Sequence, residues 1–349
     1  MAITNNSQTL DALKTATYSF NLPQELIATE AASPRESAKL LVFNRKTKKI
    51  THTIFSEIQN YIPKECAIIF NDTKVIKARL FGKKESGGKI ELLINRQLNA
   101  HDVSVYIRGK VKKETELFFD KNISAVVIKL LEDGSREVNF YHDKTLIRFE
   151  ELLPVLEEIG HIPLPPYIQR NDENHDTVDY QTVFAKYEGA VAAPTASLHF
   201  SDALFKEVQS NHDNAFVTLH VGAGTFKPVE SENILDHPMH SEYYNISAEA
   251  LEIINSDKAL LTVGTTSTRT VEYFIRNQNL TSGEANLFLH PNNLPIRVNH
   301  LLTNFHLPQS TLLMLVASFV GVEQTLALYQ EAIEKNYRFY SYGDAMLII

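Results

Sequence analysis

The chain has 349 residues, 44% of them hydrophobic and 22% charged, and a formal net charge of −8. This length and composition predict a globular protein with enough chain for two domains, and the negative charge argues mildly against a nucleic-acid partner. The one cysteine, Cys66, excludes an internal disulfide and a zinc site made of several cysteines.

No membrane segment is predicted. The first twenty residues lack the apolar core of a signal peptide. The longest apolar run, from Leu312 to Val320, has nine residues, whereas a helix needs roughly 20 to span a bilayer. We therefore expect a cytoplasmic protein with a buried helix at this run.

The first half of the chain has a β pattern. Residues 67–82 predict a buried strand, a polar corner at Asn71-Asp72-Thr73 and a second strand. From there to about His142 short alternating segments are separated by turn signals, such as Glu132-Asp133-Gly134. Short strands of this kind indicate a small antiparallel barrel or sandwich.

The second half alternates between helices and strands. Residues 145–160 predict a helix that stops at Gly160, and Ser201 and Ser247 predict the N-caps of two more helices. We expect a mixed α/β (α+β) fold of two domains. A larger, barrel-like α/β domain takes residues 1–70 and 156–349, and a small antiparallel β-barrel is inserted as residues 71–155.

Five polar motifs fall at the predicted strand ends and loops of the α/β part, where open sheets place their sites. The segment "PTASLHF" offers the hydroxyl of Thr195 and His199, although a lone histidine between apolar residues is more often part of the core. The segment "HVGAGTF" has His220 at a strand end and a turn at Gly222 and Gly224. That turn lacks the third glycine of a dinucleotide fingerprint.

The other three motifs lie further along. "HPMHSE" contains His240 and Glu242, for which acid–base or hydrogen-bonding work is favoured over metal binding, since Pro238 disfavours the helical zinc pattern. "VGTTSTR" opens a helix with Thr265, Thr266 and Arg269, a seat for an anion or a plain helix cap. "TNFHLP" offers Asn304 and His306 to the edge of a heterocycle or to its own loop.

Basic residues concentrate in the predicted β module. Between residues 74 and 89 they are Lys74, Lys77, Arg79, Lys83, Lys84 and Lys89, opposed only by Glu85. Arg108, Lys110, Lys112 and Lys113 form a second cluster. A charge run is usually a solvated face, but two clusters on one module make a phosphate-binding surface more credible.

In their order along the chain, these segments resemble the S-adenosylmethionine:tRNA ribosyltransferase-isomerase family of the queuosine pathway. The stretches that carry the resemblance run from Phe20 to Leu347 and include "NDTKVIKARLFG", "GHIPLPPYI", "YQTVFAKYEGAVAAPTASLHF", "TLHVGAGTFKPV", "HPMHSE", "VGTTSTR", "LLTNFHLPQSTLLMLVASF" and "YRFYSYGDAML". Ser197, Lys39 and the segment His290–Asn293 depart from residues usual in the family, so local differences are expected there.

The resemblance implies the reaction. The ribosyl part of S-adenosylmethionine is transferred to a 7-aminomethyl-7-deazaguanine base at the wobble position of tRNA and isomerised to give epoxyqueuosine, with release of adenine and methionine. S-adenosylmethionine is then a consumed substrate, and no cofactor or metal is expected. The partners implied are S-adenosylmethionine and tRNA, and we expect a monomer.

Matching the motifs to that reaction gives expected roles. His199, His220, His240, Glu242 and Asp72 are expected around one pocket as acids and bases, with the two kinds not told apart. Thr195, Gly222, Gly224, Thr265, Thr266, Arg269, Asn304 and His306 are expected to bind substrate. In that set Arg269 and the two threonines following Gly264 would hold the methionine carboxylate. Lys74, Arg79, Lys83, Lys84 and Lys89 are expected to hold tRNA. The resemblance thus implies that the larger domain is catalytic and that the inserted barrel contacts tRNA.

Two alternatives stay open from the sequence. One is an RNA-binding protein with a degenerate pocket, which would not bind S-adenosylmethionine. The other is an enzyme acting on a free nucleoside or small sulfonium compound, which would turn over without RNA.

Overall fold

The computed structural model describes residues 10–226, 228–277 and 280–349. The chain divides into two compact units. Unit 1 comprises Met1–Asn71, Thr195–Val217 and Lys227–Ile349, and unit 2 comprises Asp72–Pro194 and Thr218–Phe226.

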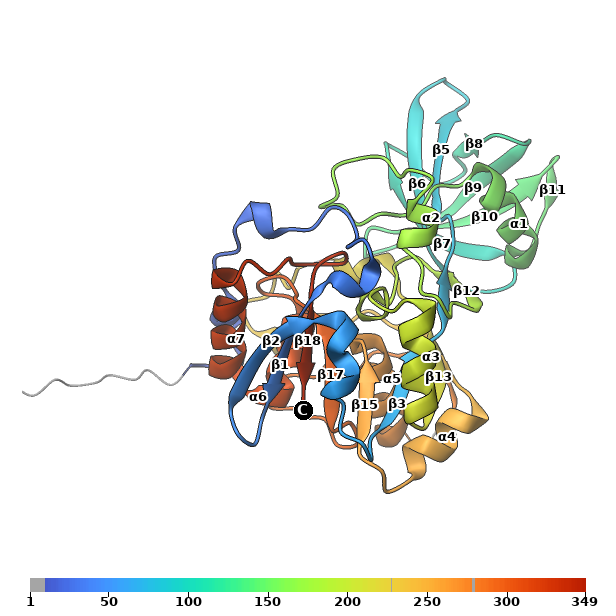
Figure 1. Ribbon diagram of the computed structural model, residues 1–349. Helices are drawn as coiled ribbons and strands as arrows, with labels where there is room; N and C mark the ends of the chain where they lie inside the picture. The colour runs from blue at the N-terminus through green and yellow to red at the C-terminus, as the bar shows by residue number, and fades with distance from the viewer. Residues whose placement is uncertain (1–9, 227, 278–279) are drawn as a thin grey trace, which may run out of the picture. The chain divides into compact units, whose positions relative to one another are not determined.

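The main feature of unit 1 is a nine-stranded mixed sheet (Figure 1). Its strands in spatial order are β16 (Ser282–Ala285), β14 (Glu242–Ile246), β13 (Asn214–Leu219), β3 (Ala67–Asn71), β15 (Leu260–Val263), β17 (His300–Asn304), β18 (Ala345–Ile348), β1 (Lys39–Asn44) and β2 (Lys49–Ile54). Strands β13, β3, β15 and β17 are neighbours and run parallel. Their carboxyl ends therefore lie at one edge of the sheet, the edge where sites of α/β sheets form.

Five helices are described in unit 1. They are α3 (Asp202–Asn211), α4 (Ala248–Asn255), α5 (Thr265–Arg276), α6 (Thr311–Val320) and α7 (Val322–Glu334). Helix α5 packs on β3, β15 and β17, and α6 packs on α7, both drawn in red in Figure 1. Short 3₁₀ turns complete unit 1: η1 (Thr15–Tyr18), η2 (Gln24–Leu26), η3 (Arg35–Ser37), η4 (Phe55–Asn60), η5 (Thr195–Ser197) and η7 (Ile234–Asp236).

Serine caps begin three of these helices, as the sequence predicted for the first two. The hydroxyls of Ser201, Ser247 and Ser310 each accept a hydrogen bond from a backbone N–H in the first turn of α3, α4 and α6. Helix α5 begins differently, after Gly264, whose φ of 90° suits a residue without a Cβ. Gly264, the N-cap residue, has no side chain that could accept a hydrogen bond from the first N–H groups of the helix.

Unit 2 is built on a closed antiparallel barrel. The strands β10 (Arg136–His142), β7 (Asp102–Arg108), β6 (Lys89–Gln97), β5 (Arg79–Lys84), β8 (Glu116–Phe118) and β9 (Ile123–Leu130) pair in this order, and β9 pairs with β10 to close it. Strand β11 (Thr145–Leu146) adds to β10. A small parallel pair, β4 (Thr73–Val75) with β12 (Tyr187–Ala190), the helices α1 (Phe149–Ile159) and α2 (Asp176–Asp179), and η6 (Ala223–Phe226) complete the unit.

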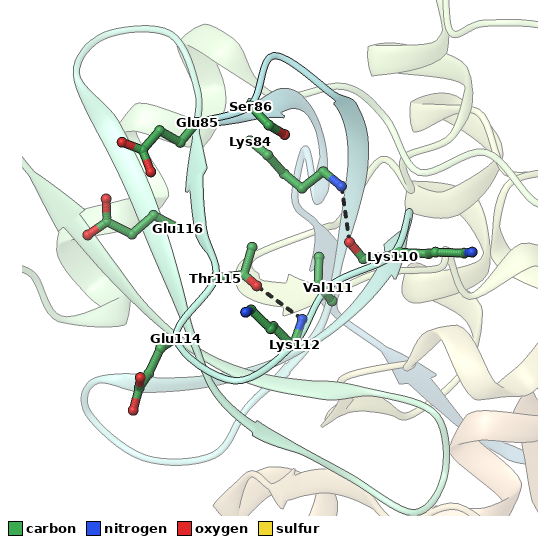
Figure 2. Close-up of a pocket in the computed structure, with 9 residues that line it drawn as sticks. All are labelled: Lys84, Glu85, Ser86, Lys110, Val111, Lys112, Glu114, Thr115 and Glu116. Atoms are coloured by element: carbon green, nitrogen blue, oxygen red, sulfur yellow. Dashed lines mark hydrogen bonds between the residues drawn. The ribbon is translucent and has the colours of Figure 1, made fainter.

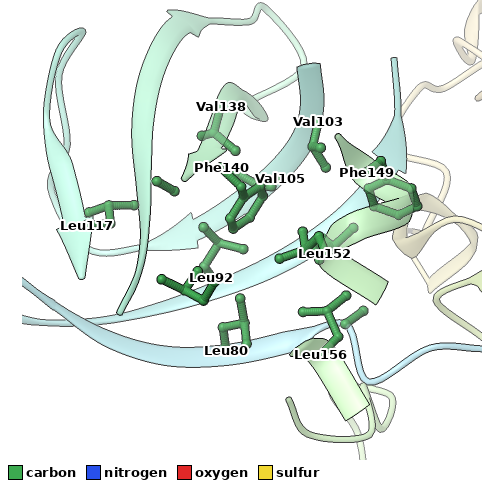
Figure 3. Packing of buried hydrophobic residues seen from close by; sticks show 14 of the residues in the cluster. Leu80, Leu92, Val103, Val105, Leu117, Val138, Phe140, Phe149, Leu152 and Leu156 are labelled. Carbon is green, nitrogen blue, oxygen red and sulfur yellow. The ribbon is translucent and has the colours of Figure 1, made fainter. Parts of the chain in front are cut away.

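Alternating apolar residues fill the barrel (Figure 3). Leu80, Leu92 and Val105 from the strands meet Leu152 and Leu156 of α1, and all five are at most 1% exposed. Helix α1 thus contributes to the barrel core, and each buried leucine stabilises it by roughly 1.5–3 kcal/mol. Gly160 follows the last residue of α1, and a larger residue would not fit there because its Cβ would lie 2.2 Å from the carbonyl oxygen of Lys77.

The predicted mixed α/β fold with an inserted antiparallel β-barrel is confirmed. The predicted hairpin is β9–β10, with Gly134 at φ 84° in its turn. The helix predicted from residue 145 is wrong at its start, because Thr145 and Leu146 pair with β10 and α1 begins at Phe149. The predicted catalytic and tRNA-contacting roles of the two domains stay predictions.

Membrane-spanning length is not reached by any single helix of the described residues. Helices α6 and α7 pass such a test of length and composition only as a pair, which is bent by 111°. Seven residues of α6 are buried inside unit 1.

Glu272 of α5 is expected to stabilise unit 1 strongly. Its fully buried carboxylate accepts hydrogen bonds from the backbone N–H groups of Ile296, Arg297 and Val298, at 2.8–3.0 Å, and pairs with Arg276. Replacing Glu272 by alanine leaves these donors unpaired, so the free energy of unfolding should fall by about 3–5 kcal/mol. Thermal unfolding should show a melting point lowered by roughly 10 °C.

The matched control is Glu252→Ala, which removes an exposed glutamate from α4. It should change the unfolding free energy by no more than about 0.5 kcal/mol. Equal losses in the two variants would contradict the role given to Glu272.

Candidate functional site

The carboxyl edge of the parallel strands in unit 1 carries several of the predicted residues. Strand β3 ends in Asn71, β15 is followed by Thr265 and Thr266, and β17 ends in Asn304. The side-chain amide of Asn71 donates to the hydroxyl of Thr266 at 3.2 Å, which joins two of these strand ends. Asn71 was not among the predicted site residues, although it precedes Asp72 in the same polar corner.

His199 lies at this edge. Its Nε2 is 2.9 Å from Oδ1 of Asn304, and its ring packs against Phe55 with centroids 4.9 Å apart. The amide nitrogen of Asn304 donates to the carbonyl oxygens of Tyr340 and Ser341, at 2.9 and 3.1 Å. The side chain of Asn304 is therefore held by two backbone carbonyls through its nitrogen and contacts the ring of His199 through its oxygen.

That arrangement decides the tautomer of His199. Because both carbonyls need the NH₂ group of Asn304, its Oδ1 faces the ring and can only accept, so Nε2 of His199 carries the proton. Burial of the ring lowers the pKa of His199 from its ordinary 6.5 to about 4, and the ring is neutral at pH 7. Nδ1 is left as a proton acceptor, and no described residue donates to it.

His306 is near Asn304 in the sequence but is held in the core. Its Nε2 is 2.8 Å from the hydroxyl of Thr303, and its backbone N–H donates to the hydroxyl of Tyr329. Burial lowers its pKa to about 3. The ring is neutral, and its contact with the hydroxyl of Thr303 holds it to its own loop.

Glu242 and Arg269 form a buried ion pair. The guanidinium Nη1 lies 2.5 Å from Oε2 of Glu242, and the other donors reach the carbonyl oxygens of Leu287, Ala285 and His240 at 3.2–3.5 Å. Arg269 is thereby occupied by its own unit, which favours a positioning role for it over direct contact with a methionine carboxylate. The side chain of His240 is half-buried.

In unit 2, the predicted residues Asp72 and His220 each form a hydrogen bond with a threonine. Thr218 donates from its hydroxyl to Asp72 Oδ1 at 2.7 Å, and burial raises the pKa of the Asp72 carboxyl. Nδ1 of His220 is 2.8 Å from the hydroxyl of Thr73, and burial lowers the pKa of His220 to about 4. The pKa shifts therefore favour the protonated form of Asp72 and the neutral form of His220.

Gly189 makes room for the His220 ring. A Cβ at this glycine, which has φ of 150°, would lie 2.9 Å from three ring atoms. The sequence did not predict the contact of Gly189 with His220, because the separation of the two residues along the chain gives no sign that they meet. A Cβ at Gly222 would lie 3.3 Å from Oδ1 of Asn95, so this glycine also lies close to a neighbouring side chain.

The remaining predicted and departing residues are placed as follows. Thr195 begins η5 and is half-buried, and Gly224 is buried in η6. Ser197 is fully buried, with no hydrogen-bond partner for its hydroxyl among the described residues. Lys39 donates to the carbonyls of Lys335 and Asn336 just after α7, so this departure is at a helix end.

Lysines gather at one end of the barrel around a groove of about 710 Å³ (Figure 2). Lys84 donates to the carbonyl of Lys110 at 3.2 Å, and Lys112 lines the same groove. Glu85, Glu114 and Glu116 line it too, and Figure 2 shows them toward the side opposite Lys110. The neighbouring Lys83, Lys89, Arg108 and Lys113 are exposed, so cations outnumber anions at this end.

Lys74 and Arg79 differ from these lysines. Lys74 Nζ is 2.7 Å from the carboxylate of Glu188, which raises the pKa of the lysine. The Arg79 guanidinium lies 3.3 Å from Glu91 and donates to the carbonyl of Leu164. Both cations are held inside unit 2, and the barrel-end lysines are better placed to meet a partner.

The part of the chain that the structure describes contains no candidate set of metal ligands. No three or more His, Cys, Asp or Glu side chains gather there as ligands of one ion.

Known proteins are similar over nearly the whole chain. The family model described as "Queuosine biosynthesis protein" matches residues 15–348. Two curated proteins named S-adenosylmethionine:tRNA ribosyltransferase-isomerase are similar. That of Sulfurimonas denitrificans is 63% identical over 97% of this chain and 98% of its own length. That of Nitratiruptor sp. is 58% identical over 97% and 100%.

A solved structure is similar as well. The crystal structure of an S-adenosylmethionine tRNA ribosyltransferase from Thermotoga maritima matches with a TM-score of 0.54 at 32% identity. The match covers 95% of this chain and 100% of that one.

Proposed function

Because the chain belongs to the queuosine biosynthesis family of S-adenosylmethionine:tRNA ribosyltransferase-isomerases, we propose that the strand-end side chains of unit 1, with His199 at their centre, carry out its proton transfers. The enzyme transfers the ribosyl part of S-adenosylmethionine to 7-aminomethyl-7-deazaguanine in tRNA and isomerises it to give epoxyqueuosine. Its substrates are S-adenosylmethionine and tRNA.

The reaction sets three demands on the protein. A base must take a proton from the carbon beside the sulfonium. The attacking aminomethyl group must be neutral, so its proton must be accepted as well. Adenine leaves more readily when an acid protonates its ring. Histidine and carboxylate groups with shifted pKa values suit such steps near neutral pH.

His199 suits the role of proton acceptor, and its bond with Asn304 is the observation that carries this proposal. A neutral ring whose Nε2–H is held by Asn304 presents Nδ1 as its only acceptor nitrogen. Packing against Phe55 limits how the ring can turn. Asn304 is then a positioning residue, and its contact with substrate is not part of the proposal.

Asp72 and Glu242 suit different tasks. Burial raises the pKa of Asp72, and a carboxyl that keeps its proton nearer to neutral pH can serve as an acid. Glu242 is held as a carboxylate partner by Arg269. His220 and His240 stay proposed for proton transfer, and Thr195, Gly222, Gly224 and His306 stay proposed for substrate binding.

The methionine carboxylate is proposed to bind at the start of α5. The N–H groups of Thr265 and Thr266 open a helix of 12 residues whose N-cap residue, Gly264, has no side chain to cap them. Such a helix end attracts a carboxylate through its N–H groups and its dipole. Arg269 supports this seat indirectly, through the carbonyl of His240 and the carboxylate of Glu242.

The barrel end is proposed to contact tRNA. Lys83, Lys84 and Lys89 come from the β5–β6 hairpin, and Lys110 and Lys112 come from the loop between β7 and β8. Lysines that release counterions from phosphates supply sequence-independent affinity for RNA. Lys74 and Arg79 are proposed to act through their partners in unit 2 rather than on RNA directly.

The use of S-adenosylmethionine, the oligomeric state and the cellular compartment are also proposed. S-adenosylmethionine is consumed as a substrate, and no further cofactor is included. A monomer in the cytoplasm is proposed, consistent with a single buried cysteine and a tRNA substrate.

Replacing His199 by alanine tests the proton acceptor. The kcat for adenine release from S-adenosylmethionine in the presence of precursor tRNA should fall by about 10²–10⁴-fold, because the base is lost. The affinity for S-adenosylmethionine, measured by calorimetry, should change far less. His142→Ala, at an exposed histidine of β10, is the matched control. A kcat for His199→Ala close to that of His142→Ala would sink the assignment.

Neutralising the barrel end tests the tRNA surface. A triple variant with Lys83, Lys89 and Lys112 changed to glutamine should bind tRNA more weakly. The slope of log affinity against log salt should be reduced by roughly one for each lost phosphate contact. Filter binding over a series of salt concentrations measures both quantities.

The control is Lys144→Gln, which removes an exposed lysine between β10 and β11. Strands β7 and β10 are antiparallel, so this turn lies at the barrel end opposite Arg108. A triple variant with the salt slope of the control would count against the surface.

A further inference from the structure

Phe81 is an aromatic residue on the outside of the barrel in unit 2, and the proposed function gives it no role. It lies on β5 directly after Leu80, which is 1% exposed in the barrel core, and the alternation of side chains along a strand turns the Phe81 ring outward. The ring is 48% exposed. A single exposed apolar side chain is ordinary on a protein surface, so its surroundings decide what it can contact.

His161 supports one side of the Phe81 ring. The two ring centroids are 5.0 Å apart and the planes are inclined by 68°, an edge-to-face arrangement. The backbone of His161 pairs with that of Arg79 in an isolated bridge, and its Nδ1 lies 2.9 Å from the carboxylate of Asp172. The pair of rings is thus positioned by the fold, which reduces the entropy lost when a ligand stacks on it.

The two rings come from separate motifs of the sequence. Phe81 belongs to "NDTKVIKARLFG" and His161 belongs to "GHIPLPPYI", both of which carry the family resemblance. The site residues proposed so far use other positions of the first motif and none of the second. The contact between the rings therefore joins parts of two motifs that still lack a role.

Cations lie on the same outer face of the barrel as the Phe81 ring. Along β5 the outward residues before and after it are Arg79 and Lys83. On the neighbouring strand β6, Glu91 lies opposite Phe81 and Lys89 lies opposite Lys83. Directly opposed residues of an antiparallel pair point to the same face of the sheet. Since Lys83 and Lys89 are exposed, a partner that touches the ring can reach them as well.

The negative charge of Glu91 on this face is compensated. Its carboxylate lies 3.3 Å from Nε of Arg79 and 3.5 Å from Nη1 of Arg108, which faces it from β7. One carboxylate thus meets two arginines, and the side chain of Arg108 is 87% exposed. With the two lysines added, the outer face around the ring carries a net positive charge, which favours an anionic partner.

An exposed ring among cations suits single-stranded RNA. Any base can stack on an aromatic side chain through its flat face, and neighbouring lysines attract the phosphates. A protein partner would require a contiguous apolar patch, whereas the residues around Phe81 on this face are charged. Bases that are free to stack are those of unpaired loops, and the wobble position of tRNA lies in such a loop.

We propose that Phe81, supported by His161, stacks on an unpaired base of the substrate tRNA while Lys83 and Lys89 contact the phosphates beside that base. This inference rests on the proposed function, since it takes tRNA as the partner of the barrel. The base that reacts must lie against S-adenosylmethionine, so the base on Phe81 is a different unpaired base of the same RNA. Stacking adds a contribution to affinity that depends little on salt, beside the salt-dependent contribution of the lysines.

Phe81→Leu tests the proposal, because it keeps an apolar side chain and removes the ring. The Kd for precursor tRNA, measured by filter binding, should rise about tenfold or more. The slope of log affinity against log salt should stay as in the wild type, since no charge is lost. Phe81→Tyr, which restores a ring, should return the Kd to near the wild-type value. Leu146→Ala, at a leucine of β11 that is 41% exposed, is the matched control and should leave the Kd unchanged.

Fluorescence reports the stacking directly. In an RNA stem-loop that carries 2-aminopurine at one unpaired position at a time, the position that stacks on Phe81 should lose fluorescence when it binds the wild type. The same position should keep its fluorescence with Phe81→Leu. Because the ring is half exposed, the melting points of the Phe81 variants should stay near that of the wild type.

Two results would overturn the proposal and leave the proposed tRNA surface intact. One is a Kd for Phe81→Leu equal to that of Leu146→Ala, while the triple lysine variant still binds weakly with a reduced salt slope. The other is an unchanged Kd with a changed particle mass in light scattering, which would make the ring a protein contact. Failure of the tRNA surface itself would appear in the triple lysine variant, whose salt slope would then match that of Lys144→Gln.

Discussion

The parallel pairing of β13, β3, β15 and β17 determines which side chains can meet in unit 1. Parallel neighbours bring their carboxyl ends to one edge, so Asn71, Thr265 and Asn304 arrive together although they are far apart in the sequence. Gly264 turns the chain from β15 into α5 with a positive φ, which leaves the helix start uncapped at this edge. His199, which lies just after η5, then joins them through its hydrogen bond to Asn304.

Burial gives the site its chemical character. In a low-dielectric surrounding the charged form of histidine is disfavoured, and the pKa values of His199 and His306 fall to about 4 and 3. What separates the two rings is their partners: Asn304 fixes the proton of His199 on Nε2, whereas Thr303 can either donate or accept. An amide whose nitrogen is already used by two carbonyls therefore sets the protonation state of a neighbouring ring, which a hydroxyl does not.

Much of the fold was predictable from the sequence, because strand alternation, serine caps and Gly134 are local signals. The motifs also named most of the polar strand ends. Partners across the fold were not predictable: the sequence places Arg269 at a helix start but not against Glu242, and it places Lys74 in a basic run but not against Glu188. Such pairings depend on tertiary contacts that no local pattern encodes.

The central claim is that Asn304 holds His199 neutral, with its proton on Nε2 and Nδ1 open to accept one. Nitrogen NMR of protein labelled at histidine, with the signals of His199 assigned by their loss in His199→Gln, measures this directly. We predict a protonated Nε2 and a bare Nδ1 at pH 7, and no second proton until the pH falls toward about 4, because burial disfavours the charged ring. A proton on Nδ1 at pH 7, or a ring that titrates near 6.5, would contradict the account.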